Sequence, residues 1–273
     1  MNILDTIIVQ KRIEVEERKT KTSVAELQQQ SLYARPVLSL KQFLLDDTRT
    51  GIIAEFKRKS PSKGIINDKV DVVEVTSAYA NNGASCLSVL TDELFFGGSS
   101  EDLVKARVNQ IPILRKDFIV DEYQITETKA MGADVILLIA ACLTTAEVKR
   151  LATFAKTLGL EVLLELHAEE ELEHICGETE IVGINNRNLK TFEVDIERSL
   201  QMAKQIPADK IKVAESGISS VENILLFKEN GFRGFLIGEY FMKEENPGIA
   251  FKNFIYKLNN SLSAQGGEVR RGL

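Results

Sequence analysis

Short apolar runs alternate with longer segments of helical periodicity between residues 51 and 239. Each run is rich in Val, Ile and Leu and is bounded by Gly, Pro or polar residues. The eight runs are GIIAEFKRK (51–59), ASCLSVLTD (84–92), IPILRKDFI (111–119), ADVILLIAAC (133–142), LEVLLELH (160–167), IVGINNRN (181–188), IKVAESGI (211–218) and FRGFLIGE (232–239). Near-continuous apolar strands between amphipathic helices are typical of a parallel sheet covered by helices. Eight such units predict a closed (β/α)8 TIM barrel rather than an open doubly wound sheet.

The segments between the runs carry the signals that mark helix ends. VVEVTSAYANNG (72–83) and DEYQITETKAMG (121–132) each end in glycine, the residue favoured just past a helix. TTAEVKRLATFAKTLG (144–159) opens with Thr and carries Glu147 near its start, which is an N-cap arrangement. The pattern therefore predicts a helix in each of these three segments.

The two ends of the chain lie outside this alternation. ILDTIIVQKRIEVEERK reads as an amphipathic helix with a solvated charged face, and SLKQFLLDD (39–47) as a second short helix. We expect residues 1–48 to form an N-terminal helical extension that covers one end of a barrel spanning 49–260. Residues 261–273 include the polar, glycine-containing segment SAQGGEVRRGL (263–273), and we expect this tail to fray.

Composition and charge narrow the class of protein. The chain has 273 residues, of which 44% are hydrophobic and 27% charged, as in ordinary globular proteins. A net charge of −6 gives no basic field for nucleic acid. Neither a signal peptide nor an apolar run of membrane-spanning length is visible, so we expect a cytoplasmic protein without membrane association. Polar helix faces favour a monomer, although a dimer through the N-terminal helices stays open.

Cysteine and histidine give little sign of a metal site. Cys86, Cys142 and Cys176 lie far apart, which suits a reducing compartment, and the first two are expected to pack as small hydrophobes. The chain has only two histidines, His167 and His174, with no cysteine or third histidine beside them, so we expect no zinc site. His167 follows a strand-end glutamate, but an ordinary, partly exposed position is favoured over a site-lining one.

Ionisable and amide side chains follow the carboxyl ends of five of the eight predicted strands. Along the first strand, the alternation of side chains places Glu55, Lys57 and Lys59 on one face. Phe56 and Arg58 take the opposite face. The full set is Glu55, Lys57, Lys59, Lys116, Asp117, Glu165, Asn185, Arg187, Glu215 and Ser216. The amino ends of the strands carry no comparable cluster, so this rim predicts an active site rather than a solvated polar edge.

Two glycine turns near the end of the barrel indicate a phosphate site. AESGIS (214–219) and IGEY (237–240) place Gly217 and Gly238 where a strand turns toward a helix. Barrels commonly bind phosphate after strands seven and eight through exposed backbone N–H groups. Lys59 and Ser60 in the first loop would add a cation and a hydroxyl, whereas the carboxylate of Glu239 must turn away from the anion. These features predict a phosphorylated small-molecule substrate.

Five ordered motifs resemble one enzyme family. The strings IIAEFKRKSPSKG, LSVLTDELFFGGS, PILRKDFIVDEYQI, GINNRNL and VAESGI are similar to those of the indole-3-glycerol-phosphate synthase family, from about residue 50 to residue 243. The resemblance implies a carboxy-lyase of tryptophan biosynthesis. Its reaction closes the ring of 1-(2-carboxyphenylamino)-1-deoxyribulose 5-phosphate, with loss of carbon dioxide and water, to give indole-3-glycerol phosphate. It implies no cofactor and no metal.

The resemblance also implies a role for each motif residue. Lys116 is the general acid at the carbonyl, and Glu165 is the general base in dehydration. Lys57 binds the substrate carboxylate and serves as the acid for the departing hydroxyl, although the division of acid roles between the two lysines stays open. Glu55 orients and tunes either lysine. The remaining assignments are substrate binding by Asn185, Arg187, Glu215 and Ser216, an apolar slot for the anthranilate ring formed by Phe96, Phe118 and Leu189, and phosphate binding by Lys59, Ser60, Gly217 and Gly238.

Three other functions fit parts of the pattern. A Schiff-base aldolase would use Lys116, a strand-end lysine flanked by acids, and it predicts trapping by borohydride. A sugar-phosphate isomerase fits the barrel but does not require so many cations. A phosphate sensor or a structural protein with an inactive site is disfavoured, because an acid, a base and a carboxylate-binding cation are all present.

Overall fold

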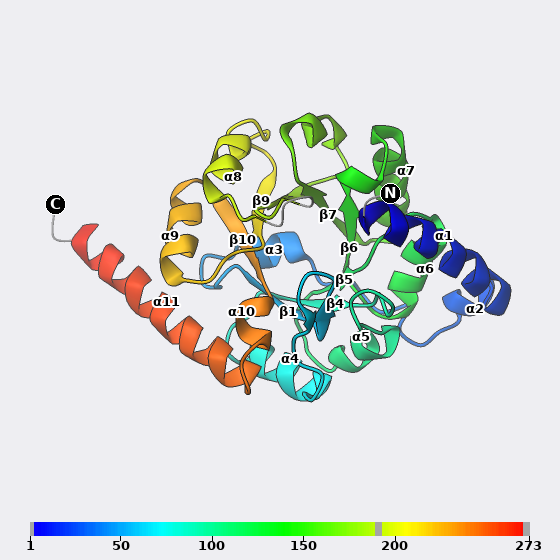
Figure 1. Ribbon diagram of the computed structural model, residues 1–273, viewed down its shortest axis with the longest axis horizontal. Helices are drawn as coiled ribbons and strands as arrows, with labels where there is room; N and C mark the ends of the chain where they lie inside the picture. Colours follow the sequence, from blue (N-terminus) through cyan, green and yellow to red (C-terminus); the bar gives the residue numbers. More distant parts are fainter. Residues whose placement is uncertain (1–2, 189–192, 270–273) are drawn as a thin grey trace.

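The protein folds as a closed barrel of eight parallel strands (Figure 1). The computed structural model describes residues 3–188 and 193–269. The barrel strands are β1 (Ile52–Phe56), β4 (Cys86–Leu90), β5 (Ile113–Lys116), β6 (Val135–Ile139), β7 (Glu161–Leu166), β8 (Ile181–Asn185), β9 (Ile211–Glu215) and β10 (Phe232–Ile237). β1 pairs with both β4 and β10, which closes the ring. All eight predicted strands and the barrel are therefore confirmed.

Helices cover the outside of the barrel. They are α4 (Val72–Asn81), α5 (Ser100–Ala106), α6 (Glu122–Ala130), α7 (Thr145–Thr157), α8 (Ile196–Ala203), α9 (Val221–Glu229), α10 (Glu239–Met242) and α11 (Pro247–Val269), with 3-10 turns η1 (Ala140–Cys142) and η2 (Glu169–His174). The predicted cap of α7 is confirmed, because Thr144 and Glu147 form a reciprocal capping box. Between β7 and β8, the short turn η2 replaces a full helix.

The last helix is longer than the sequence predicts. α11 continues to Val269, into the segment from residue 263 that was expected to fray. Its earlier turns are held by Phe251, Phe254 and Leu258, which are buried against the barrel. Extending a helix is far easier than starting one, so these turns carry the helix past its polar residues. The division of the chain at residues 48 and 260 stays a prediction.

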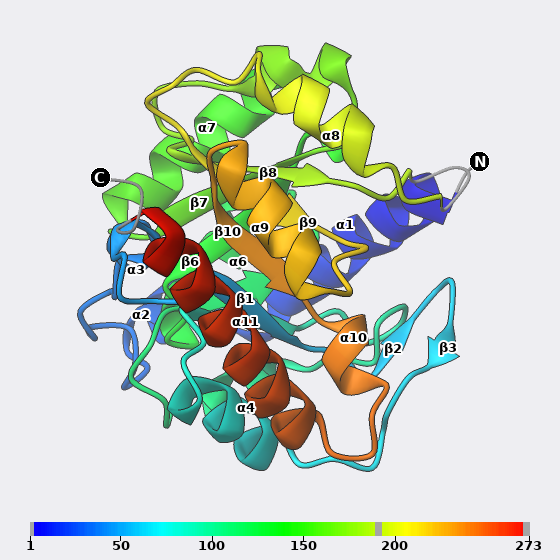
Figure 2. The ribbon, with the colours of Figure 1, turned by 90° about the vertical axis from the view of Figure 1, so that its left-hand side faces the viewer.

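The first strand ends earlier than its sequence suggests. β1 stops at Phe56, and the chain then forms a small antiparallel hairpin of β2 (Lys59–Ser60) and β3 (Gly64–Ile65). Figure 2 shows this hairpin beyond one end of the barrel, on the same side as α10. The prediction that Lys59 faces the same way as Glu55 is wrong, because the alternation stops with the strand. The ammonium of Lys59 instead donates to the carbonyl of Leu94, 3.1 Å away.

The N-terminal segment covers both ends of the barrel instead of one. It forms α1 (Ile3–Lys21), α2 (Val24–Gln28) and α3 (Leu40–Leu45). Leu40 and Leu44 of α3 are buried in the apolar cluster that fills the barrel. The Ser39 hydroxyl and the Lys41 backbone N–H contact the carboxylate of Glu161, the first residue of β7, so α3 lies at the amino end. α1 lies at the opposite, carboxyl end, as the separation of the two helices in Figure 2 shows.

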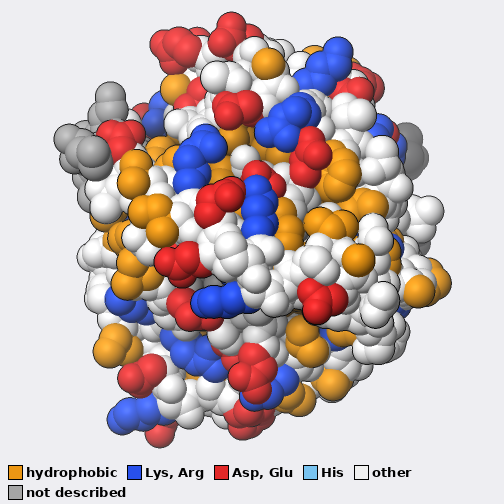
Figure 3. Space-filling model, turned by 90° about the vertical axis from the view of Figure 1, so that its right-hand side faces the viewer, with side chains coloured by type: hydrophobic (Ala, Val, Ile, Leu, Met, Phe, Trp, Pro, Cys, Tyr) orange, Lys and Arg blue, Asp and Glu red, His pale blue; other side chains and the backbone are white. Residues whose placement is uncertain are grey.

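The charged face of α1 is only partly solvated. Figure 3 shows side chains of both signs intermixed on the face of the molecule that α1 helps to form. Arg12 and Glu16 of α1 are exposed. Lys11 departs from this pattern, because only 1% of its surface is exposed. The expectation of a uniformly solvated charge run is therefore wrong at this residue, since periodicity alone does not show which charges meet a buried partner.

The cysteines are unpaired, and Cys86 is fully buried, as expected of a small hydrophobe. Cys142 and Cys176 are half-buried. Within residues 3–188 and 193–269, no helix combines the length and the apolar character that crossing a membrane requires.

Candidate active site

A cavity of about 1010 Å³ opens at the carboxyl ends of the barrel strands. Each of the eight strands, or the loop that follows it, contributes to its lining. The predicted site residues that line it are Glu55, Lys57, Ser60, Phe96, Lys116, Phe118, Glu165, Asn185, Arg187, Glu215, Ser216, Gly217 and Gly238. Lys59 lies apart from the cavity, and Leu189 lies outside the described residues. The structure thus gathers residues from distant motifs into one pocket.

Lys116 lies among buried carboxyl groups. Its ammonium nitrogen is 3.0 Å from Oε2 of Glu165 and 4.0 Å from Oε2 of Glu215. Burial alone would lower the pKa of Lys116, but the neighbouring carboxyl groups, Glu165 first and then Glu215 and Glu55, outweigh it and raise that pKa above its ordinary value. The side chain is therefore a charged proton donor. A Schiff-base lysine needs a free amine, so this arrangement argues against the aldolase alternative.

Both carboxylate oxygens of Glu165 accept hydrogen bonds. Oε2 accepts from Lys116, and Oε1 accepts from the side-chain amide of Asn185 at 3.0 Å. Burial of the carboxyl would raise its pKa, but Lys116, His167 and Asn185 together lower that pKa well below its usual range. The group is consequently ionised at neutral pH and free to accept a proton.

His167 belongs to the site, so the expectation of an ordinary, partly exposed histidine is wrong. It is 7% exposed, and its Nε2 lies 2.9 Å from Oε1 of Glu165, at ion-pair distance but without hydrogen-bond alignment. The turn η2 explains this burial, because the Glu171 carboxylate in that turn accepts the backbone N–H of His167 at 2.6 Å. The sequence signal was the position of His167, two residues after Glu165 at the end of β7.

Glu215 is the counterpart of Glu165 with a pKa shifted in the opposite direction. Burial, followed by the neighbouring charge of Glu165, raises the pKa of Glu215 well above its ordinary value, and the nearby Lys116 does not reverse this. Gly183 in β8 gives this side chain its space, because a Cβ there would lie 2.1 Å from Oε1 of Glu215. The pocket thus holds two carboxyl groups whose pKa values are shifted in opposite directions around a single ammonium, an arrangement suited to proton transfer.

Lys57 and Glu55 form a second ion pair on the floor of the cavity. Lys57 Nζ lies 2.8 Å from Oε1 of Glu55, whose other oxygen accepts from Ser88 at 3.2 Å. Burial would raise the pKa of Glu55, but Lys57 and Lys116 lower it. A Cβ at Gly238 would come within 2.6 Å of the same Oε1, so this glycine makes room for Glu55 in addition to its predicted place at the phosphate end.

The predicted phosphate end of the cavity is formed by turns that follow the barrel strands. Ser216 and Gly217 both have left-handed backbones, with φ of +65° and +70°, where the chain leaves β9. Such a conformation at the non-glycine Ser216 is strained and is typical of ligand sites.

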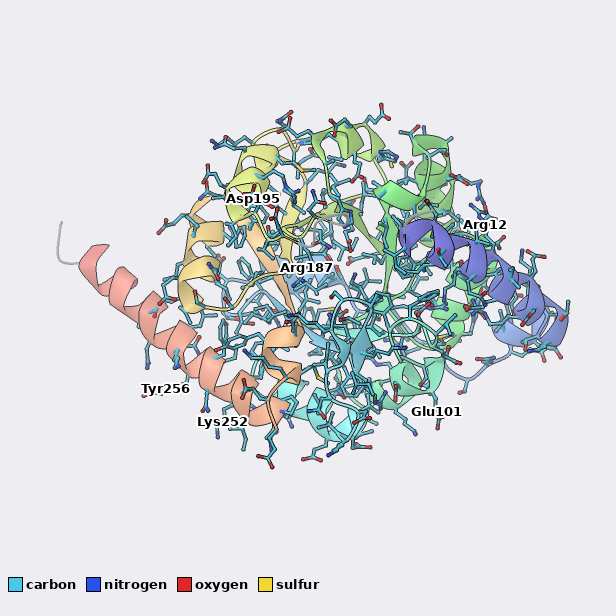
Figure 4. All side chains as sticks on the ribbon, in the orientation of Figure 1. Arg12, Glu101, Arg187, Asp195, Lys252 and Tyr256 are labelled. Carbon is cyan, nitrogen blue, oxygen red and sulfur yellow. The ribbon has the colours of Figure 1, made fainter. Side chains whose placement is uncertain are left out.

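Glu239 faces two cations at longer range, with Arg187 at 3.6 Å and Lys63 at 3.9 Å. Figure 4 shows Arg187 over the middle of the barrel opening, whereas Arg12 lies on the outer side of α1.

The opposite end of the cavity is apolar. The rings of Phe96 and Phe118 lie 5.9 Å apart between centroids, with their planes tilted by 42°. Sequence reasoning found these two but missed Ile3, Leu4 and Ile7 of α1, and Tyr240 and Lys243 in and just after α10, which also line the cavity. The spacing of Ile3 and Ile7, one helical turn apart, was a usable signal for an inward face of α1.

The chemistry of the cavity rests on lysine and carboxyl groups. In the part of the chain that the structure describes, no cluster of three or more His, Cys, Asp or Glu side chains is placed to hold a metal ion. The arrangement offers a proton donor, a proton acceptor and a separate cation within one pocket.

Comparison with known proteins points to one family. The family model for indole-3-glycerol phosphate synthase matches residues 4–254. The indole-3-glycerol phosphate synthase of Bacteroides thetaiotaomicron is 49% identical over 255 residues, which cover 93% of this chain and 98% of that protein. The protein of the same name from Bordetella pertussis is 42% identical over 259 residues, with coverage of 93% and 99%.

Solved structures share the fold at low sequence identity. KGPDC from Streptococcus mutans superposes with a TM-score of 0.56 at 15% identity, covering 76% of this chain and 97% of that one. A mutant tryptophan synthase alpha-subunit from Pyrococcus furiosus gives a TM-score of 0.59 at 16% identity, with coverage of 77% and 98%. At this identity the likeness shows the barrel fold alone.

Proposed function

The chain belongs to the indole-3-glycerol phosphate synthase family, and we propose that the cavity at the carboxyl ends of its strands is the active site. The protein is a carboxy-lyase of tryptophan biosynthesis that acts on a phosphorylated small molecule. Its reaction converts 1-(2-carboxyphenylamino)-1-deoxyribulose 5-phosphate into indole-3-glycerol phosphate, carbon dioxide and water. The observation that carries the site assignment is the buried contact of 3.0 Å between Lys116 and Glu165.

Lys116 supplies the proton for ring closure. The aromatic carbon that bears the carboxylate attacks the ketone carbon, and the ketone oxygen takes a proton from the ammonium of Lys116. Loss of carbon dioxide from the same aromatic carbon then restores aromaticity. The carboxyl groups around Lys116 keep it protonated before each turnover, which supports this role.

Glu165 and Lys57 act in the dehydration. The carboxylate of Glu165 removes a proton from carbon while the hydroxyl leaves as water with a proton from Lys57, which also binds the substrate carboxylate. Lys116 and Lys57 each donate one proton and Glu165 accepts one, so each turnover consumes one proton from solvent. The direct contact between Glu165 and Lys116 supports return of the abstracted proton to the first acid.

The two ends of the cavity suit the two ends of the substrate. Phe96 and Phe118 supply an apolar slot for the anthranilate ring. Ser60, Gly217 and Gly238 line the end assigned to the phosphate, and Arg187 lines the same cavity. Lys59 is left out of this proposal, because its ammonium is directed to Leu94.

We also propose that the enzyme works in the cytoplasm as a monomer. Three free cysteines and the absence of any disulfide between described residues support a reducing compartment. A solution mass of twice the 30.4 kDa of one chain would overturn the monomer.

An indole-fluorescence assay tests the reaction directly. The purified chain is mixed with carboxyphenylamino-deoxyribulose phosphate, without metal or nucleotide. The chain contains no Trp, so a growing indole signal comes from product. A flat trace from folded protein, together with borohydride trapping of the substrate, would instead support the aldolase alternative.

Gly183→Ala is expected to lower turnover while the barrel still folds. The new methyl group would occupy the space of Glu215 Oε1 and displace that carboxyl from Lys116. A displacement near 1 Å at a reacting group can cost about 10²-fold in rate. Gly177→Ala is the matched control, because a Cβ there meets nothing within 4 Å. Equal turnover in the two variants would show that the position of Glu215 is unimportant.

A further inference from the structure

Lys11 of α1 is a buried cation in contact with three carboxylates. Its ammonium nitrogen lies 2.8 Å from Oδ2 of Asp92, 3.1 Å from Oδ1 of Asp117 and 2.9 Å from Oε2 of Glu14. The side chains of Lys11, Asp92 and Asp117 are each 1% exposed. Asp92 follows β4 and Asp117 follows β5, so this one lysine joins α1 to two neighbouring loops at the rim of the barrel.

The two aspartates hold the loops that carry the aromatic slot. Oδ1 of Asp92 accepts the backbone N–H groups of Phe95 at 2.8 Å and Phe96 at 3.2 Å. Oδ1 of Asp117 accepts the backbone N–H of Phe118 at 2.8 Å. Each carboxylate thus fixes the backbone of one slot residue through a hydrogen bond, and each also forms an ion pair with Lys11.

Lys11 also anchors a helix that adds apolar residues to the lining of the same cavity. Ile7 lies one helical turn before Lys11 on the buried face of α1 and lines the cavity, as Ile3 and Leu4 do. Side chains four residues apart lie on one face of a helix, so anchoring Lys11 sets the depth of Ile7. Apolar residues that line the cavity are therefore carried by three chain segments that meet at a single ammonium.

We propose that Lys11 is a positioning residue for the aromatic end of the substrate. This inference rests on the proposed function, because it assumes that the apolar end holds the anthranilate ring. Lys11 does not line the cavity, so it acts through Asp92, Asp117 and the helix that carries it. Because the slot binds the ring in both the ground state and the transition state, losing its shape weakens binding more than it slows chemistry.

The test compares Lys11→Met with Lys19→Met in the full chain. Lys19 is also on α1 and also pairs with a carboxylate of the barrel, with Glu16 and Asp121 each 2.9 Å away, but it lies two helical turns further along and is 33% exposed. For Lys11→Met we expect KM to rise by roughly tenfold to 10²-fold with kcat within about threefold of wild type. For Lys19→Met we expect both constants to stay at wild-type values.

Inhibition by inorganic phosphate distinguishes a specific loss of the aromatic slot from a general loosening of the cavity. The inhibition constant reports the opposite end of the cavity, so Lys11→Met should leave it unchanged. A proportional rise in KM and in the phosphate inhibition constant, or an unchanged KM, would overturn the proposal. Asp117 keeps its ion pair with Arg115 when Lys11 is replaced, so Asp92 is the buried aspartate that loses its cation. If Lys11→Met does not fold, Lys11→Met/Asp92→Asn, which removes that charge, takes its place. Absence of turnover in the wild type would reject the proposed function itself.

Discussion

Lys116→Met is expected to lower kcat by about 10²–10⁴-fold, the range that a positioned general acid contributes. Methionine matches the length of the lysine side chain but has no proton to give to the ketone oxygen. The substitution also leaves Glu165 without its closest cation, so the pKa of that carboxyl should rise toward its ordinary range. Turnover by indole fluorescence measures the first effect, and circular dichroism checks that the barrel remains folded.

Lys59→Met is the matched control for this prediction. Lys59 is another lysine of the same rim and was a predicted phosphate ligand, but its ammonium donates to a backbone carbonyl outside the cavity. We expect kcat and KM of this variant to stay near wild type. Loss of turnover in Lys59→Met, or its retention in Lys116→Met, would contradict the placement of the two side chains.

The barrel and most of its rim were predictable from local patterns. Eight apolar runs gave eight strands, because a strand buried on both faces needs a continuous run of Val, Ile and Leu. Lys116, Glu165 and Asn185 could be placed because each lies at the carboxyl end of a strand, and a barrel brings those ends together. The same reasoning failed for Lys59, since it assumed that β1 continues past Phe56.

Contacts between segments that are distant in sequence could not be predicted from such local patterns. Lys11 falls in step with Ile7 and Val15 on the inward face of α1, but that spacing does not show which carboxylates it meets. Its partners, Asp92 and Asp117, lie about 80 and about 100 residues further along the chain. The space that Gly183 leaves for Glu215 likewise depends on β8 and β9 being neighbours, which only the closed sheet establishes.

Glu165→Gln is expected to lower kcat by about 10²–10⁴-fold while KM changes little, because glutamine keeps the shape of the side chain but does not accept the proton. The lowered pKa of Glu165 sets the pH dependence of the wild type. The carboxylate is the active form, and it persists above its depressed pKa, so activity should survive as pH falls through the ordinary range of a glutamate. The check is a pH profile of kcat on the wild type.

Glu215→Gln should be the milder of the two substitutions, and this contrast tests the assignment of the two carboxyl groups. The raised pKa of Glu215 favours its neutral form, so a neutral amide there changes the charge around Lys116 less than the same change at residue 165. At residue 165 the same change removes a negative charge that holds Lys116 protonated. An equal loss of kcat in both variants would mean that Glu215 itself transfers a proton, because an amide replaces its hydrogen bonds but not its acidity.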